Sequence, residues 1–212
     1  MHLKKLTIIG FSEPVLTMIF DNLESCQVFP DIVVVNNLQL NAQHAYQNAR
    51  FNISQQQTYN QDASPYFLGV NKAENKIKVV SLFNLKNEHA TCITHTSAEI
   101  ASTVNMGSGC MINSHVSVAG QSSIGNFVTI NRNASVGHHT VLEDFVTINP
   151  GAHVAGFVTI GKGSTIGMGA NVIDGITIGK NVTIGAGSVV TKNIEDNAVA
   201  YGNPCRVVRI KN

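Results

Sequence analysis

The chain has 212 residues, of which 43% are hydrophobic and 13% charged, and its formal net charge is +1 at pH 7. This length is enough for one large domain or two small domains with hydrophobic cores. The lysines are scattered rather than concentrated as nucleic-acid binding requires, and no apolar stretch is long enough to span a membrane.

The cysteines and the first residues predict a cytoplasmic protein. The cysteines are far apart and form no CxxC pair: Cys26, Cys92, Cys110 and Cys205. Such spacing is typical of reduced thiols. The opening "MHLKKLTIIGF" places lysines before apolar residues, as a signal peptide does, but the apolar run ends at "SEPV" and no cleavage-like site follows. We therefore expect no signal peptide.

Residues 4 to about 90 have the pattern of an α/β unit. "KKLTIIG" predicts a strand, and "SEPVLTMIFDNLES" predicts a helix with Ser12 as N-cap and Pro14 in the first turn. "DIVVVNN" predicts a buried strand of a parallel sheet. Residues 39–61 predict helix plus loop, "YFLGVN" a third strand, and "KIKVVSLF" a helix or a strand.

A six-residue repeat begins near Ile100. Every sixth position from Ile100 to Val190 is aliphatic or methionine, and a small or β-branched residue lies two positions before most of them. Glycine often follows the aliphatic position, as at Gly125 and Gly161, which suits a tight corner. Each hexapeptide therefore predicts a short strand and a corner. Three hexapeptides close a triangular coil of a parallel β-solenoid.

Residues 18 apart should stack on neighbouring coils of this solenoid. His138 then shares a corner with Gly120 below and Gly156 above, followed by Asp174 and Lys192. Asn113, Asn131 and Asn149 form another column, which we interpret as an amide ladder that is structural at Asn113 and Asn149. A corner histidine is more often solvated than catalytic, so this column alone does not assign a function to His138.

Three stretches, "NASVGHHTVLEDFVTINPGAHVAG", "TIGAGSVVTKNI" and "YGNPCRVV", carry a resemblance to a known family. Over residues 4–210 the chain resembles hexapeptide-repeat acyltransferases of the sialic-acid O-acetyltransferase-like and bacillosamine-pathway sugar N-acetyltransferase subgroup. The resemblance implies a Rossmann-like α/β domain at residues 1–92 and a left-handed parallel β-helix at residues 93–212. It also implies a homotrimer with active sites shared between subunits.

The same resemblance implies roles for four residues. His138 would be the general base that removes a proton from a sugar amine or hydroxyl, as an imidazole with an ordinary pKa of ~6.5 can do near neutral pH. The Gly156 N–H would stabilise the oxyanion, and Asn131 would position the acceptor. Relatives carry an acidic residue after the histidine, where this chain has His139. His139 can orient His138 by a hydrogen bond, and Glu143 or Asp144 are candidates to replace the missing charge.

The cofactor implied is acetyl-CoA, held in a groove between neighbouring solenoids. The cofactor-binding residues expected from this position are Thr147, Gly156, Met168, Ala186 and Lys192. No metal is expected, because the histidine spacings do not fit a γ-type carbonic anhydrase, the zinc enzyme built on the same solenoid.

The acceptor implied is a sugar or a nucleotide-linked sugar, with Ser12 and Asn36 as expected contacts. Relatives have a glycine-rich turn after the first strand, whereas this chain has "GFSEPV", in which Glu13 would repel a phosphate. N-acetylation of a nucleotide-linked amino sugar is favoured slightly over O-acetylation of a sugar. A catalytically weak solenoid that assists a sugar-biosynthesis enzyme is the alternative from another functional class.

For the trimer contact, we expect apolar flanks such as Val128, Val146 and Val158.

Overall fold

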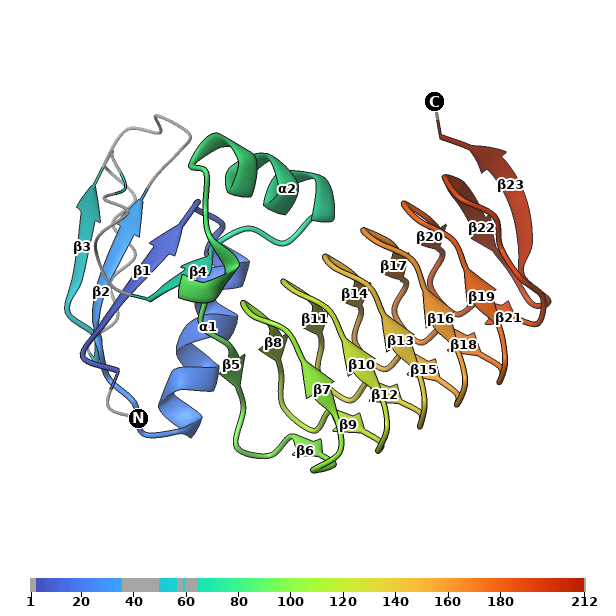
Figure 1. The fold of residues 1–212 in the computed structure, drawn as a ribbon, viewed down its shortest axis with the longest axis horizontal. Helices are drawn as coiled ribbons and strands as arrows, with labels where there is room; N and C mark the ends of the chain where they lie inside the picture. The colour runs from blue at the N-terminus through green and yellow to red at the C-terminus, as the bar shows by residue number, and fades with distance from the viewer. Residues whose placement is uncertain (1–2, 36–49, 57–58, 60–64, 212) are drawn as a thin grey trace.

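The computed structural model describes residues 3–35, 50–56, 59 and 65–211. They form an N-terminal parallel sheet with two α-helices, followed by a long β-solenoid (Figure 1). None of the helices in these ranges is long and apolar enough to cross a bilayer.

The N-terminal sheet has four parallel strands in the order β3-β2-β1-β4. Its strands are β1 (Lys5–Ile9), β2 (Asp31–Val35), β3 (Ile53–Gln56) and β4 (Tyr66–Leu68). Helix α1 (Glu13–Ser25) connects β1 to β2, and helix α2 (Ala73–Leu82) follows β4, with a short 3-10 helix η1 (Asn87–His89) after it. The structure confirms the first two predicted strands, the strand "YFLGVN" and the first helix. The stretch "KIKVVSLF", predicted as a helix or a strand, is helical. Strand β3 lies where we expected helix plus loop.

Ser12 occupies the N-cap position of α1, but its side chain makes no capping hydrogen bond. Pro14 lies in the first turn, where its missing N–H is no loss because that amide would have no intrahelical partner. One face of the helix is buried against β1 and β2 and carries mostly aliphatic side chains and one phenylalanine: Val15, Leu16, Ile19, Phe20 and Leu23.

The solenoid has three parallel sheets, one on each face of a triangular prism. The first sheet contains β5 (Ile93–Thr94), β8 (Met111–Ile112), β11 (Thr129–Ile130), β14 (Thr147–Ile148), β17 (Thr165–Ile166), β20 (Thr183–Ile184), β22 (Ala198–Tyr201) and the antiparallel β23 (Arg206–Ile210). The second contains β6 (Glu99–Ile100), β9 (Ser117–Val118), β12 (Ser135–Val136), β15 (His153–Val154), β18 (Asn171–Val172) and β21 (Val189–Val190). The third contains β7 (Asn105–Met106), β10 (Ser123–Ile124), β13 (Val141–Leu142), β16 (Thr159–Ile160) and β19 (Thr177–Ile178).

The register confirms the predicted stacking, since partners such as Ser135 and His153 are 18 residues apart. The aliphatic repeat positions are buried in one continuous core, except at the first coil, where Ile100 is half-buried and Met106 is 38% exposed. Met106 is exposed because β7 is the terminal strand of its sheet. The expected trimer flanks Val128, Val146 and Val158 are wrong, because all three are fully buried in this core.

The repeat glycines are not required for a tight turn, as the sequence suggested, but for space. A Cβ on Gly161 would lie 2.6 Å from the carbonyl carbon of Gly179, so glycine is required there because the next coil passes too closely. The left-handed corner conformation occurs two residues later. It recurs at every sixth residue from Gly109 to Gly187, and several of these positions hold histidine, asparagine or phenylalanine.

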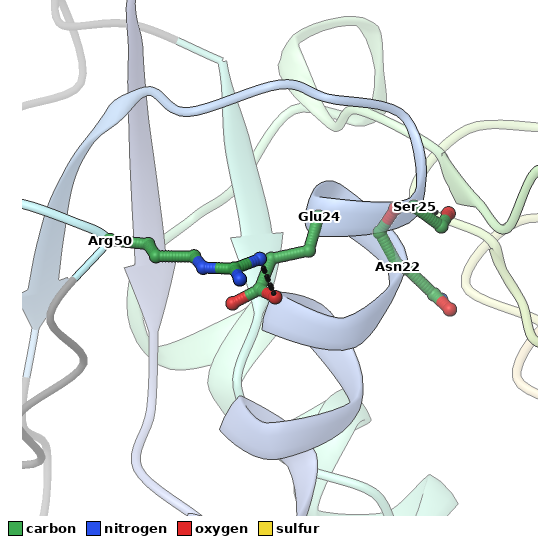
Figure 2. Close-up of polar contacts among 4 residues, drawn as sticks. All are labelled: Asn22, Glu24, Ser25 and Arg50. Atoms are coloured by element: carbon green, nitrogen blue, oxygen red, sulfur yellow. Dashed lines mark hydrogen bonds and ion pairs between the residues drawn. The ribbon is translucent and has the colours of Figure 1, made fainter.

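Helix α1 attaches the N-terminal sheet to the start of the solenoid by polar contacts. Asn22 Nδ2 donates to Asn113 Oδ1 at 3.0 Å, and the Thr96 N–H donates to Ser25 Oγ at 3.1 Å. Figure 2 shows Asn22 and Ser25 projecting from one side of α1 and Glu24 from the other, where it meets Arg50 at 2.8 Å. The end of α1 is therefore held from both sides.

Candidate active site at a solenoid edge

His138 lies at the corner between the second and third solenoid sheets. This corner recurs at residues 119–122, 137–140, 155–158 and 173–176, which we call the His138 edge. The chain turns there because His139 adopts a left-handed conformation with φ of 57°. Both histidines follow the buried Val136 and precede the buried Leu142, so their side chains stand at the surface of the prism.

The His138 imidazole lies directly against the backbone of Gly156. A Cβ built on Gly156 would lie 2.8 Å from His138 Cε1 and 3.0 Å from Nε2. Only a residue without a side chain leaves room for the ring in this position, so the predicted contact between His138 and Gly156 is confirmed. Within the described part of the chain, the Gly156 N–H has no hydrogen-bond acceptor.

One hydrogen bond and two ring contacts hold the histidine pair. His138 Nδ1 and His139 Nδ1 are 3.1 Å apart, within hydrogen-bond distance. The Phe157 ring stacks on His139 with a centroid distance of 4.9 Å and meets His138 edge-on at 5.0 Å. Phe157 is 60% exposed, so these contacts lie on an open surface.

The acidic residues that follow the histidines do not replace the missing acidic neighbour. Glu143 Oε2 accepts a hydrogen bond from the Lys162 N–H at 2.9 Å. Asp144 Oδ1 accepts from the Asn126 N–H at 2.7 Å and from its side-chain amide. Both carboxylates therefore bind amides at the corner between the third and first sheets. The expectation that Glu143 or Asp144 supplies charge to His138 is not supported.

Asn131 is buried in the amide ladder. It accepts a hydrogen bond from Asn113 at 3.1 Å and donates to the Ile148 carbonyl at 3.1 Å. Asn149 instead donates to the Ile166 carbonyl, so the ladder runs from Asn22 through Asn113 to Asn131. Because the amide of Asn131 already has these partners, the contacts assign it a structural role. Its role towards the acceptor stays a prediction.

The expected cofactor residues fall in three different places. Thr147 is 4% exposed and its hydroxyl is buried without a hydrogen-bond partner among the described residues, so it offers nothing to a cofactor at the surface. Met168 and Ala186 are exposed at the corner between the first and second sheets, residues 131–134, 149–152, 167–170 and 185–188, which we call the Met168 edge. Lys192 is exposed and follows the last strand at the His138 edge.

Helix α2 covers the first sheet of the solenoid through Lys76, which is 4% exposed. Its ammonium donates to the Phe127 carbonyl at 2.9 Å and to Thr129 Oγ1 at 2.7 Å. Both acceptors are neutral, and burial lowers the pKa of Lys76 to about 8. Lys76 therefore joins the helix to the coils that precede the candidate site.

A cleft of about 580 Å³ lies outside the carboxyl ends of β1 and β4. The strand order reverses between these two strands, which is where open α/β sheets bind ligands. Ser12 lines the cleft together with Asn71, Lys72 and Lys78. The Asn71 side-chain oxygen is buried and lacks a hydrogen-bond partner in the described ranges. Asn36, the other expected acceptor contact, lies outside the described residues.

The sequence interpretation missed three of these residues. Phe157 could have been found, because it lies 18 positions after His139 in the same column. Asn71 is the last residue of the predicted strand "YFLGVN" and Lys72 follows it, at the end where ligands bind in parallel sheets. Neither residue lies in the turns after the first two strands, where the acceptor contacts Ser12 and Asn36 were expected.

Comparisons with known proteins extend this description. A family model described as bacterial transferase hexapeptide (six repeats) matches residues 139–172 and 157–192. No curated protein sequence matches the chain.

Solved structures match almost the whole chain. The histidine-to-asparagine mutant of perosamine N-acetyltransferase from Caulobacter crescentus, in complex with CoA and GDP-perosamine, has 24% identity, covers 97% of each chain and has a TM-score of 0.82. A second match is the acetyltransferase domain of PglB from Neisseria gonorrhoeae in complex with acetyl coenzyme A. It is 23% identical to this chain, the alignment covers 97% of this chain and 99% of the PglB domain, and the TM-score is 0.83. WeeI from Acinetobacter baumannii has 20% identity, with coverage of 96% and 100% and a TM-score of 0.77. Residues 139–192 therefore carry the bacterial transferase hexapeptide repeat, and the chain as a whole shares its fold with these three proteins.

Proposed function

We propose that this protein is an acetyl-CoA-dependent acetyltransferase that N-acetylates a nucleotide-linked amino sugar, with His138 as general base. The observation that carries the proposal is the His138 imidazole lying against Gly156, whose N–H has no acceptor within the described residues. A base and an oxyanion donor are thus adjacent on an accessible edge. Proteins of the same fold bind CoA and a nucleotide sugar, as in the perosamine N-acetyltransferase complex.

The reaction follows from these two groups. The amine nitrogen of the acceptor attacks the thioester carbonyl, and His138 Nε2 takes the proton that the nitrogen loses. The Gly156 N–H donates to the oxygen that becomes negative in the tetrahedral intermediate. The C–S bond then breaks, and CoA leaves as a thiolate that receives a proton. O-acetylation of a sugar would use the same two groups on a hydroxyl.

The nucleotide part of the acceptor would occupy the cleft at β1 and β4. The Lys72 and Lys78 side chains line it and would attract a diphosphate, which offsets the repulsion expected from Glu13. The unpartnered oxygen of Asn71 would accept a hydrogen bond from a nucleoside N–H or O–H. Ser12 lines the same cleft, which supports it as a contact of the acceptor.

The site would be completed by a second chain in a homotrimer. His138 and Met168 lie on different edges of the prism, so one chain alone does not bring the base beside that part of the expected cofactor groove. Both edges expose large apolar side chains: Phe157 and Ile173 on the His138 edge, and Met168 on the other. Two different edges that meet make a heterologous contact, which closes into a ring in a trimer.

The finer architecture belongs to the same proposal. The solenoid would be a left-handed β-helix that begins at residue 93, and residues 1–92 would be a Rossmann-like domain in a cytoplasmic protein. Two features support this boundary and domain type. Ile93 is the first residue paired within a solenoid sheet, and the strand order β3-β2-β1-β4 is the first part of the doubly wound order.

The test is CoA thiol release from acetyl-CoA with a panel of UDP-, GDP- and dTDP-linked amino sugars, free amino sugars and sialic acid. We expect release with one nucleotide-linked amino sugar, and a loss of at least about 100-fold in His138→Ala. His89→Ala is the matched control, since His89 is also an exposed histidine but lies in η1, away from both edges of the proposed site.

The remaining outcomes distinguish the alternatives. Release with sialic acid alone would show the O-acetyl reaction. No release with any acceptor, together with no binding of acetyl-CoA, would contradict the proposal and favour the catalytically weak solenoid.

A further inference from the structure

We propose that His139 and Phe157 form a positioning pair that fixes the tautomer and orientation of the His138 imidazole, in place of the carboxylate carried by related sites. This inference rests on the proposed function for its kinetic consequences, but its structural content does not depend on the reaction.

The hydrogen bond between the two histidines restricts their protons. Two neutral imidazoles bond through their Nδ1 atoms only when one carries its proton on Nδ1 and the other on Nε2. His138 Nδ1 faces His139 at 3.1 Å, so Nε2 is the nitrogen of His138 left for a substrate. It is available as a base only if His138 donates from Nδ1 and His139 accepts. His139 must then carry its proton on Nε2.

Phe157 holds the accepting ring in place. It stacks on His139 with an interplanar angle of 21° and meets His138 edge-on at 87°. The two rings contacted by Phe157 are themselves nearly perpendicular, at 88°. The Phe157 N–H also donates to the His138 carbonyl at 2.9 Å. This hydrogen bond ties the backbone of Phe157 to that of His138.

Other described side chains around the two histidines do not position the His138 imidazole. In the described part of the chain, no charged side chain bonds to either imidazole. The coil below contributes the Gly120 carbonyl, which accepts from the His139 N–H, and the coil above contributes Gly156 and Phe157. The ionisable residues of the same edge are Asp174 and Lys192, one and two coils beyond Gly156.

Protonation of His139 would switch the base off. An imidazolium donates from both nitrogens, so its Nδ1–H would point at His138 Nδ1. His138 would then need its own proton on Nε2, and no lone pair would remain there for the acceptor. A proton added to either ring would therefore block the reaction.

Four variants and one spectroscopic measurement test the pair. His139→Phe removes the acceptor and keeps a stacking ring, and phenylalanine already occupies the same left-handed corner position at Phe127 and Phe145. Phe157→Gly removes the clamp, and Gly175 occupies the equivalent position one coil further on. His139→Asp restores the carboxylate. Asn181→Gly is the control for a change at a left-handed corner outside the pair, because Asn181 lies at the corner between the third and first sheets, away from both edges of the proposed site.

We expect His139→Phe and Phe157→Gly to lower kcat by about 10-fold or more, with little change in KM for acetyl-CoA. In His139→Asp, the acidic limb of the pH–rate profile should move to higher pH, because a carboxylate raises the pKa of a neighbouring imidazole. Asn181→Gly should behave as wild type. An unchanged kcat and pH profile in His139→Phe would overturn the proposal.

Nitrogen-detected NMR of histidine-labelled protein at neutral pH shows which nitrogen of each ring carries the proton, and it needs no activity measurement. We expect His138 protonated on Nδ1 and His139 on Nε2, with the His138 preference lost in His139→Phe. A proton on Nε2 of His138 in the wild-type protein would refute the positioning pair. If no acceptor reacts, the proposed function fails, but the NMR result still decides the positioning.

Discussion

Apart from His139, the neighbours that position His138 carry no reactive side chain. Gly156 gives the ring a flat backbone surface to lie on, and Val136 and Leu142 anchor the strands on either side in the core. The left-handed conformation of His139 is not special to this corner, because every sixth residue from Gly109 to Gly187 shares it. The repeat therefore supplies the geometry, and only the side chains are particular to the site.

Gly156→Ala should damage the site without unfolding the protein. The new methyl carbon would lie within 3.1 Å of three ring atoms of His138, so the imidazole would have to move. We expect the rate of CoA release to fall by about 100-fold, as a displacement of about 1 Å of a catalytic group can produce. The midpoint of thermal unfolding should change little.

Gly120→Ala is the matched control, since its new methyl group would meet only the side chains of Thr103 and Ala101. Equal losses of rate in Gly120→Ala and Gly156→Ala would show that the effect comes from the coil backbone and not from His138.

Lys76 makes the stability of the protein depend on pH in a definite direction. Burial lowers its pKa from 10.5 in the unfolded chain to about 8 in the folded one. Between these values the unfolded state binds more protons, so the free energy of unfolding rises with pH. The full difference corresponds to about 3 kcal/mol. Below pH 8 both states are protonated and the folded state carries the whole penalty of burying the charge.

Urea unfolding of the wild-type protein and Lys76→Met at intervals from pH 7 to pH 10 measures this effect. We expect the stability of the wild type to increase relative to that of the variant as the pH rises from 8 to 10. Methionine fills a similar volume and does not titrate, so the difference isolates Lys76 from the cysteines and tyrosines that ionise in the same range. Parallel curves for the two proteins would contradict a lowered pKa.

At the scale of elements, the solenoid from β5 to β21 is built from strands of two residues that would not be stable singly. Each strand contributes one inward side chain to a continuous core, and stacking on the next coil satisfies its backbone groups. Helix α1 continues this arrangement at the open end of the prism. Its Asn22 joins the amide ladder, so the ladder links the helix to two successive coils.

Asn113→Leu tests the ladder. The substitution leaves the Asn22 amide donor and the Asn131 carbonyl oxygen buried without their partner, at about 1–3 kcal/mol for each group. We expect the free energy of unfolding in urea to fall by about 2 kcal/mol or more. Asn149→Leu should have a smaller effect, because Asn149 is only part-buried and donates to a backbone carbonyl outside the ladder. A larger loss in Asn149→Leu would show that the ladder does not stabilise the junction.

At the scale of the whole molecule, one chain provides the parts of a site on separate edges. The proposed base and oxyanion donor lie on the His138 edge, and two exposed residues expected to bind the cofactor lie on the Met168 edge. The cleft at β1 and β4 is a third, separate element. A trimer with each His138 edge against a neighbour's Met168 edge would join the first two.

Mixing two inactive variants tests this arrangement. His138→Ala lacks the base, and Met168→Glu places a charge in the proposed cofactor groove. If each site takes one edge from each of two chains, trimers reassembled from an equal mixture should recover about a quarter of the wild-type rate. Light scattering should give about three times the chain mass of 22.7 kDa. No recovery in mixed trimers, or a monomeric mass, would contradict shared sites.

The sequence by itself determined the solenoid, because a hexapeptide period admits few other structures. The inward positions, the 18-residue stacking and the contact of His138 with Gly156 all follow from that period. The period also predicts the column that contains Phe157. In the N-terminal part, β-branched runs predicted β1 and β2, whereas the polar strand β3 gave no such signal and was missed.

Only the tertiary structure decided what covers each face of the prism. The repeat makes all outward positions equivalent, so the buried Thr147 could not be told from the exposed Met168 by sequence alone. The partners of Asn131, Glu143 and Asp144 likewise depend on which side chain of the next coil lies opposite. A local period fixes where the chain turns, and contacts between distant segments fix which of those turns remain open to a substrate.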